Sequence, residues 1–268
     1  MKKSLSLIIA LALLPSFFFA AGKKKQEVIR VAMEGTWKPF GFVNEQGELA
    51  GFDVDVIKAI SERIKDDNIK IQIEKTGWDG IFLALETGRI DVIANEIKKN
   101  PAREQRYLYA DKPYNYDYPV IIFKKERNDI NTAEDLFGKK VIVGTGSSFA
   151  DWLEAFNKKT GNKVTTIYTG NDTTLQTIFA DIVSGRADAA IDSPIGAEAL
   201  ISEQGYPLRY VKSDPDFLNP AFWVFRRNKK GEYLKEIFGE ALEEIRADGT
   251  LSKLAIKWFG TDTTVKSK

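Results

Sequence analysis

The stretch LETGRIDVIANE, residues 85–96, has a counterpart later in the chain that determines how the fold is organised. Residues 182–194 read IVSGRADAAIDSP, so both copies hold Gly-Arg-x-Asp, a short apolar run and then polar residues. Gly88 and Gly185 each follow a helical pattern, and glycine is the usual residue at a helix end because it adopts the left-handed conformation. The apolar runs after them predict buried strands. The chain therefore builds one helix–turn–strand unit twice, and we interpret the Gly, Arg and Asp as a helix stop with a salt-bridged turn.

The residues around the first copy predict an α/β lobe. The ranges 28–33, 69–73 and 90–94 are apolar or alternating and predict strands. A helical stripe follows Asp53, which we expect to be the N-cap, and a second helix begins at Trp78. Strands that alternate with helices imply a largely parallel sheet covered by helices.

The second copy lies in an equivalent series of elements. Strands are predicted at 141–143, 164–168 and 187–191, with a helix at about 148–159. Another helix is expected to begin at a capping box, residues 173–176. A second α/β lobe follows from this order.

Two segments rich in aromatic residues are expected to cross between the lobes. KPYNYDYPVIIFKK begins at Lys112, and DFLNPAFWVFRRN begins at Asp216. Two amphipathic helices follow, one closing near Gly249 and one spanning residues 251–258. We expect lobe 1 to comprise residues 23–115 and 221–268, and lobe 2 to comprise residues 116–220.

Composition narrows the classes of function. Of 268 residues 43% are hydrophobic, which is enough for a sizeable core. The chain has no Cys and no His, so disulfides, the usual zinc ligands and the commonest general base are missing. We therefore expect no metal, no cofactor and no catalytic residue, although carboxylates and Lys remain able to transfer protons. A formal net charge of +1 without a clustered basic excess argues against nucleic acid as a partner.

The first 22 residues are typical of a secretory signal peptide. Lys2 and Lys3 precede an apolar run from Leu5 to Leu14, and Ala20-Ala21-Gly22 supplies small residues before a cleavage site. The run is short for a membrane span, which needs about 20 apolar residues. We expect a mature protein in the periplasm.

The site is expected where strands end, because ligands of open α/β sheets bind at the carboxyl ends of strands. These ends are Asn95-Glu96-Ile97 in lobe 1 and Asp192-Ser193 in lobe 2.

Seven segments in order make the chain resemble the polar-amino-acid-binding group of bacterial extracytoplasmic solute-binding proteins, which feed ABC importers. The resemblance covers nearly all of the mature chain and implies two α/β lobes, joined by two strands, that close on a ligand like a hinge. The segments are VAMEGTWKPFGF, GFDVDVIKAI, GWDGIFLALETGRIDVIA, NPAREQRYLYADKPY, GKKVIVGTGSS, GRADAAIDSP and ADGTLSKLAIKWFG.

The resemblance also implies roles for particular residues. It places the α-carboxylate of the ligand on Arg103, the α-ammonium on Asp192, and stacking contacts on Trp37 and Trp78. A turn that helps to hold the carboxylate falls on Gly146, Ser147 and Ser148. A free amino acid is a zwitterion, so a cation, an anion and helix N-terminal N–H groups suit it.

Each of these residues also has a structural interpretation. Arg103 could pair at the surface with Glu104 or Asp111, Trp78 could be core, and Asp192 could cap the following helix.

One departure from the family pattern lies at the end of the first lobe's strand. The family commonly has Gly and then Ser or Thr two residues later, where this chain has Glu96 and Lys98. Beside Asn95, Lys98 would be a movable cation at the mouth of the site. We expect it to bind a distal anionic group of a long ligand, or else to point with Lys99 into water.

The expected function is capture of a polar amino acid, cystine or a similar one, by a monomer that delivers it to an ABC permease. The alternative is an enzyme on the same scaffold, such as a prephenate or arogenate dehydratase, with Glu34 or Glu96 as the acid. A sensor module is a third interpretation.

Overall fold

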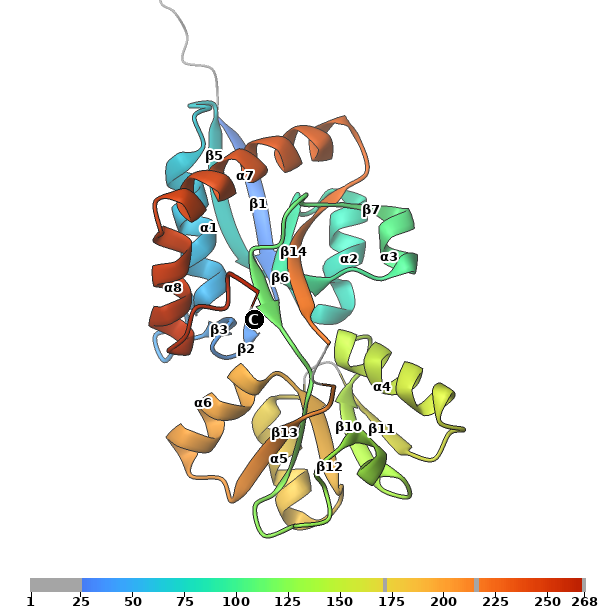
Figure 1. The fold of residues 1–268 in the computed structure, drawn as a ribbon. Coiled ribbons are helices and arrows are strands. Elements are labelled where there is room, and N and C mark those ends of the chain that lie inside the picture. Colours follow the sequence, from blue (N-terminus) through green and yellow to red (C-terminus); the bar gives the residue numbers. More distant parts are fainter. Residues whose placement is uncertain (1–25, 171–172, 215–216, 267–268) are drawn as a thin grey trace, which may run out of the picture.

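The computed structural model describes residues 26–170, 173–214 and 217–266. They form two α/β lobes, one above the other in Figure 1, each with its own central sheet. This is the architecture that the repeat predicts, although both sheets are mixed where largely parallel sheets were expected.

Lobe 1 has the sheet order β5-β1-β6-β14-β7, with β8 also paired to β14. The first three strands are parallel, and β14 runs antiparallel to β6, β7 and β8. Helices α1, α7 and α8 pack on one face, and α2 packs on the other. The strands are β1 (Glu27–Met33), β5 (Ile69–Lys75), β6 (Val92–Lys98), β7 (Tyr107–Tyr109), β8 (Asn115–Asp117) and β14 (Asn219–Arg226). The helices are α1 (Phe52–Arg63), α2 (Trp78–Thr87), α3 (Pro101–Arg106), α7 (Lys229–Ala247) and α8 (Thr250–Phe259).

A small antiparallel sheet completes lobe 1 on the side that faces lobe 2 (Figure 1). Its strands are β2 (Thr36–Trp37), β3 (Gly41–Val43) and β4 (Leu49–Ala50).

Lobe 2 has the order β11-β10-β12-β9-β13, with a parallel half formed by β11, β10 and β12. Helix α4 packs on one face, and α5 and α6 pack on the other. The strands are β9 (Val120–Lys124), β10 (Lys140–Gly144), β11 (Thr165–Thr169), β12 (Ala189–Asp192) and β13 (Leu208–Lys212). The helices are α4 (Ser148–Lys159), α5 (Leu175–Ser184) and α6 (Pro194–Gln204), with a 3₁₀ turn at Ala133–Leu136.

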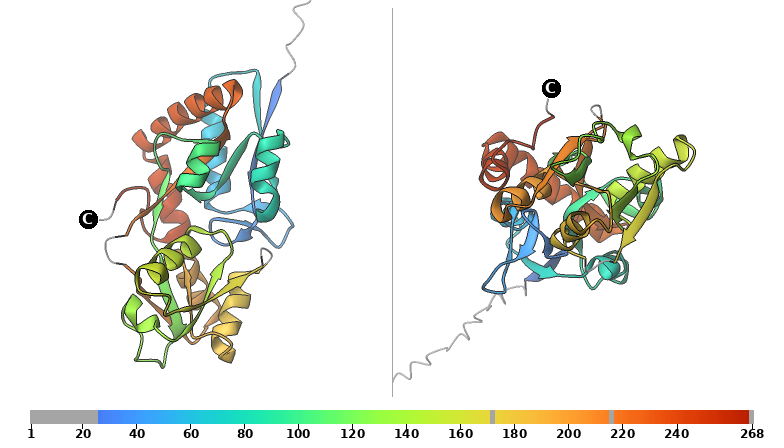
Figure 2. Two further views of the ribbon diagram at one scale, coloured as in Figure 1. Left: turned by 90° about the vertical axis from the view of Figure 1, so that its right-hand side faces the viewer. Right: turned by 90° about the horizontal axis from the view of Figure 1, so that it is seen from below.

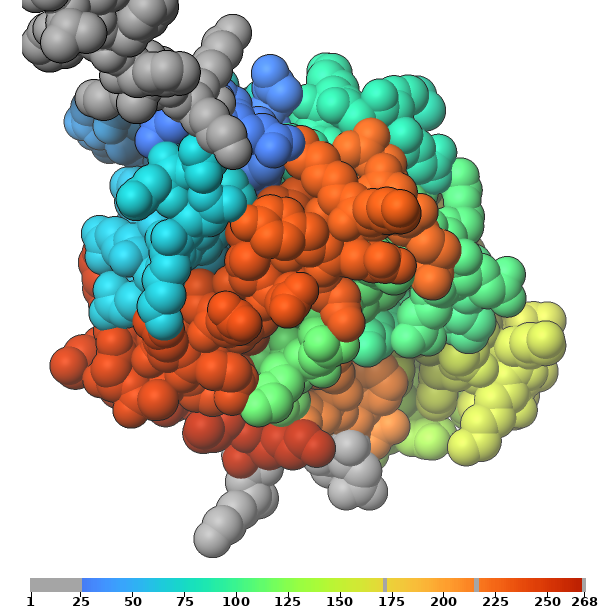
Figure 3. Space-filling model, turned by 90° about the horizontal axis from the view of Figure 1, so that it is seen from above, coloured from blue at the N-terminus to red at the C-terminus, as the bar shows by residue number. Residues whose placement is uncertain are grey.

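The two connections between the lobes lie side by side as an antiparallel pair. Strand β8 pairs with the start of β14, with Asp117 opposite Asn219 and Asn115 opposite Ala221. Both ends of the chain therefore contribute to lobe 1, and Figures 2 and 3 show the blue-to-cyan N-terminal part beside the orange C-terminal part. The lobe boundaries expected near residues 115 and 220 fall within this pair and remain a prediction.

The repeated Gly-Arg-x-Asp turn has the same structure in both lobes. Gly88 and Gly185 end α2 and α5 in the left-handed conformation, with φ of 77° and 81°. The Asp that follows then bonds to the backbone of the lobe's first parallel strand. Asp91 donates its N–H to the carbonyl of Arg30 and accepts the Arg30 N–H, and Asp188 does the same with Lys140.

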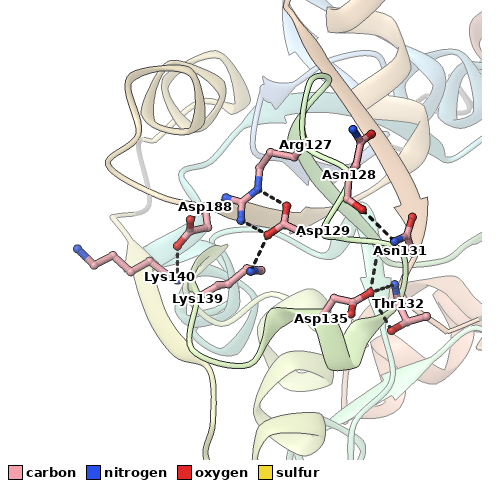
Figure 4. Close-up of polar contacts among 9 residues, drawn as sticks. All are labelled: Arg127, Asn128, Asp129, Asn131, Thr132, Asp135, Lys139, Lys140 and Asp188. Atoms are coloured by element: carbon pink, nitrogen blue, oxygen red, sulfur yellow. Dashed lines mark hydrogen bonds and ion pairs between the residues drawn. The ribbon is translucent and has the colours of Figure 1, made fainter.

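The ion pairs of these turns come from remote basic residues. Asp91 binds Lys230 of α7 at 2.8 Å, and Asp188 binds Arg127 at 2.7 Å. Figure 4 shows the second of these, where Arg127 also binds Asp129. The helix stop is as predicted, but the motif Asp pairs with Lys230 or Arg127 rather than with the motif Arg, and it fixes one strand to its neighbour.

Three local predictions are corrected by the structure. Asp53 is not the N-cap of α1, since Gly51 is, and Asp53 instead accepts a buried hydrogen bond from the hydroxyl of Tyr114. Helix α5 begins after Thr174, whose side chain accepts from the Thr177 N–H, one residue later than expected. Strand β6 continues beyond the apolar run to Lys98, because β14 pairs with residues 97 and 98.

The two aspartates allow a test of the repeat. Asp91→Ala removes a side chain that is 3% exposed, leaves the buried Arg30 N–H without its partner and leaves Lys230 paired with Glu27 alone. We expect a loss of about 2–3 kcal/mol of unfolding free energy. Asp188→Ala, at 36% exposure, should cost only about 1 kcal/mol. Urea denaturation measures both, and equal losses would contradict the difference in burial.

Candidate functional site

A cavity of about 860 Å³, including the part open to solvent, lies between the lobes. Its walls follow the carboxyl ends of parallel strands in both sheets, namely β1 and β6 in lobe 1 and β10, β11 and β12 in lobe 2. This is where open α/β sheets place their ligands.

The residues predicted from the sequence meet at this cavity, except for Gly146. Lobe 1 contributes residues next to β1 and β6 as well as α2 and α3, and lobe 2 contributes the turn after β10 and the end of β12. The predicted residues that line it are Glu34, Trp37, Trp78, Asn95, Glu96, Lys98, Arg103, Ser147, Ser148 and Asp192. Gly146 does not line the cavity, but its carbonyl oxygen accepts a hydrogen bond from Arg103 Nη2 at 2.8 Å.

Other lining residues were missed by the sequence analysis. Thr145 and Thr169 directly follow or end strands β10 and β11, so the rule of strand ends, applied to every strand, would have found them. Leu175 and Ile178 belong to the apolar stripe of α5 and carry no signal that separates a cavity wall from core. The remaining members are Thr36, Ile97, Gly144, Phe149, Gly170 and Thr173.

Arg103 is positioned by a short helix and crosses to the other lobe. Asn100 caps α3 by accepting the Arg103 N–H at 2.8 Å. The guanidinium lies 4.8 Å from the ring centre of Phe82 and 5.6 Å from that of Trp78. Asp111 pairs with Lys235 instead, so the surface pairing considered for Arg103 and Asp111 is not formed. The result is a planar cation held against aromatic faces at the cavity wall.

The N-terminus of α4 faces the same space. Ser147 caps this helix by accepting the Ala150 N–H at 3.1 Å, and the Ser148 hydroxyl accepts from Asn219 Nδ2 at 2.9 Å. Ser147, Ser148 and Phe149 all line the cavity. Backbone N–H groups and the helix dipole favour an anion at such an end.

Asp192 provides a carboxylate of unusual proton affinity. Burial raises its pKa to about 7, the negative charges of Asp117 and Glu34 add to the effect, and the Ser193 N–H opposes it. That N–H donates to Asp192 Oδ1 at 2.7 Å. Ser193, rather than Asp192, caps α6. A cationic group in the cavity would therefore stabilise the charged form of Asp192.

Glu96 and Lys98 form a buried ion pair. Lys98 Nζ lies 3.0 Å from Glu96 Oε2, with side-chain exposures of 4% and 0%. The expectation of a movable Lys98 at the mouth is wrong, because this pair holds its ammonium inside the protein. Lys99 is exposed, and its ammonium lies 4.4 Å from the ring centre of Phe222.

Contacts between the lobes bridge the two walls of the cavity. Trp78 Nε1 donates to the Thr145 carbonyl at 3.2 Å, and Lys38 pairs with Glu203 of α6 at 2.7 Å. Asn100 Nδ2 donates to Asp151 Oδ2 at 3.1 Å. The structure is thus a closed form, with aromatic and polar contacts on both sides of the cavity.

Within residues 26–170, 173–214 and 217–266, no helix is both long enough and apolar enough to cross a membrane. The same residues contain no group of three or more His, Cys, Asp or Glu side chains placed to hold a metal ion.

Residues 29–261 match the model of the bacterial extracellular solute-binding proteins, family 3. A putative amino-acid ABC transporter-binding protein of Vibrio harveyi, PatH, is 39% identical over 88% of this chain and 90% of its own length. The L-cystine-binding protein TcyJ of Bacillus subtilis is 33% identical over 99% of this chain and 98% of its own. Among solved structures, a putative L-cystine ABC transporter protein from Listeria monocytogenes superposes with a TM-score of 0.80 at 27% identity, covering 90% of this chain and 100% of that one.

The raised pKa of Asp192 predicts a measurable effect on the stability of the closed form. Ionising this carboxyl costs more free energy in the closed cavity, where it is buried, than in water, so the penalty on the closed form is absent below pH 4 and grows until about pH 7. Without ligand, Asp192→Asn should therefore favour the closed form by about 1–2 kcal/mol at pH 8 and have little effect at pH 4. Small-angle X-ray scattering of the ligand-free variant and parent at both pH values measures this, and a variant no more compact than the parent at pH 8 would contradict the burial of the charge.

Proposed function

Because the chain belongs to family 3 of the bacterial extracellular solute-binding proteins, we propose that it captures a polar amino acid between its lobes and delivers it to an ABC permease. The observation that carries the proposal is the arrangement of charge in the cavity. Arg103 and the N-terminus of α4 favour a carboxylate, and Asp192 favours an ammonium group. A zwitterion bound between them would touch both lobes and hold them closed.

Trp37 and Trp78 would bound the ligand with aromatic faces. Trp37 packs edge-to-face on Phe149 of lobe 2 with ring centres 6.2 Å apart, so it already spans the closed cavity. Trp78 also reaches lobe 2, where its Nε1 donates a hydrogen bond to the Thr145 carbonyl. These contacts support a role for both Trp in closure on the ligand.

For the ligand we propose cystine or a similar long polar amino acid. The support is the name of the TcyJ relative, together with a cavity wall that includes Thr169, Thr173, Leu175 and Ile178 beside the charged groups. A short amino acid would leave that apolar part of the wall uncovered.

We propose binding without turnover. The relatives reported above are named as binding proteins or transporter components. Of the two acids considered for a dehydratase, Glu96 is engaged by Lys98, and Glu34 accepts the hydroxyl of Thr36 at 2.6 Å. Incubation with prephenate tests this, and product formation would contradict it.

The remaining features of the proposal concern the whole chain. Residues 1–22, the expected signal peptide, lie outside the described residues, and we propose that they are removed on export to the periplasm. The mature protein would act as a monomer with an amino acid and a permease as its partners, without nucleic acid and without a cofactor.

Calorimetric titration with L-cystine, L-glutamine, L-glutamate, L-lysine and L-serine tests the function. Arg103→Ala and Asp192→Ala should each weaken the tightest ligand by roughly 3–5 kcal/mol, because each leaves one ligand charge unpaired in a closed cavity.

Arg106→Ala is the matched control for Arg103. This arginine lies on the same helix but pairs with Glu86 at the surface. It should leave affinity unchanged. Binding by the folded Arg103→Ala protein within a few-fold of the parent would show that Arg103 is not an anchor.

A further inference from the structure

The buried pair of Glu96 and Lys98 lies at the junction of the cavity, the sheet of lobe 1 and the crossing strands. Both residues line the cavity, and both are at the end of β6. Glu96 has a left-handed backbone, φ 51°, next to a register shift opposite Phe222 and Val224. Glutamate rarely adopts this conformation, so the surrounding contacts must hold it there.

Glu96 is fixed by groups from several segments. Its carboxylate oxygen Oε2 accepts from Lys98 Nζ and from Asn115 Nδ2 of β8, both at 3.0 Å. Its N–H donates to the hydroxyl of Tyr114, which in turn donates to Asp53. The carboxylate therefore has no freedom to turn away from Lys98.

Lys98 retains capacity to donate. An ammonium has three N–H donors, and in the described part of the chain its one hydrogen bond or ion pair is with Glu96. The side chain is 4% exposed and lines the cavity, so a ligand bound there can accept from the remaining donors. A ligand therefore meets the positive charge of Lys98 together with the negative charge of Glu96.

The other buried carboxyl groups near this pair have raised pKa values and interact with its charges. Burial raises the pKa of Asp53 well above its usual value, and it raises the pKa of Asp117 to about 6. The charge of Lys98 lowers the Asp117 pKa and that of Glu96 raises it, and Asp117 in turn raises the pKa of Asp192. The charges of Glu96 and Lys98 thus act on Asp117 in the hinge strand, and the charge of Asp117 acts on Asp192 in lobe 2.

We propose that Glu96 and Lys98 together determine the charge class of the ligand, with Lys98 excluding basic amino acids and Glu96 excluding acidic ones. The inference rests on the proposed function and adds a selectivity mechanism to it. As a pair the two residues add no net charge to the cavity. Removing either one leaves a buried charge of one sign, and a ligand of the opposite sign would then compensate it.

The test uses Lys98→Met, Glu96→Gln and the double variant, titrated with L-lysine, L-glutamate and neutral L-glutamine. Lys98→Met should shift the ratio of lysine to glutamate affinity at least about tenfold toward lysine, and Glu96→Gln should shift it similarly toward glutamate. The double variant should return within about threefold of the parent ratio.

Lys99→Met is the matched control, since it removes the same charge from the adjacent exposed position. It should leave the ratio unchanged. If Lys98→Met does not fold, Lys98→Gln takes its place in the same titrations, because the glutamine amide can still donate to Glu96. The same shift of the affinity ratio toward lysine is expected.

Equal weakening of all three ligands, or shifts of both single variants in one direction, would overturn the inference and reduce the pair to a structural role. A parent protein that binds none of the amino acids would contradict the proposed function and the inference together. A parent that binds, with variants that keep its ratio, would contradict the inference alone.

Discussion

The antiparallel pairing of β8 with the start of β14 is the constraint on which the rest of the structure depends. These two crossings are hydrogen-bonded to each other from Asn115 to Asp117, so the lobes are joined by a pair of strands rather than by a loose linker. The pairing holds the carboxyl ends of two separate sheets face to face. Without it, Arg103 and Asp192 would belong to independent domains.

The hinge strands are also chemically tied to lobe 1. The Asn115 side chain donates to Glu96 and accepts from the hydroxyl of Thr263 in the C-terminal segment, and Tyr114 is fully buried between Phe52 and Trp223. Buried polar groups of this kind must stay paired, because an unpaired one costs about 1–3 kcal/mol. The hinge is therefore anchored firmly on the lobe 1 side. On the lobe 2 side, Asn219 donates to the Ser148 hydroxyl, Asp117 accepts the Tyr118 N–H and Ser213 donates to the Pro119 carbonyl. Both lobes are thus tied to the paired strands, which favours rotation of each lobe as a unit.

The sequence predicted the two-lobe order because the hydrophobic periodicity of each unit is set locally. Gly88 and Gly185 end helices as expected, and α4 begins at Ser148, where the pattern places it. The strand-end rule likewise located Asn95 and Asp192. The features that the sequence did not predict depend on residues far away in the chain. Strand β6 extends to Lys98 because β14, more than a hundred residues later, pairs with it, and Asp53 is drawn from a cap position to Tyr114 for the same kind of reason. Lys98 is buried because Glu96 takes a backbone conformation that periodicity does not encode.

Closure around an amino acid is the central claim, and small-angle X-ray scattering measures it most directly. The closed structure has contacts from Trp78 to Thr145 and from Lys38 to Glu203 that an open form would lose. The mature protein without ligand should therefore show a larger radius of gyration than the same protein saturated with its tightest ligand from the amino-acid panel. An unchanged radius of gyration at saturating ligand would contradict capture by hinge closure.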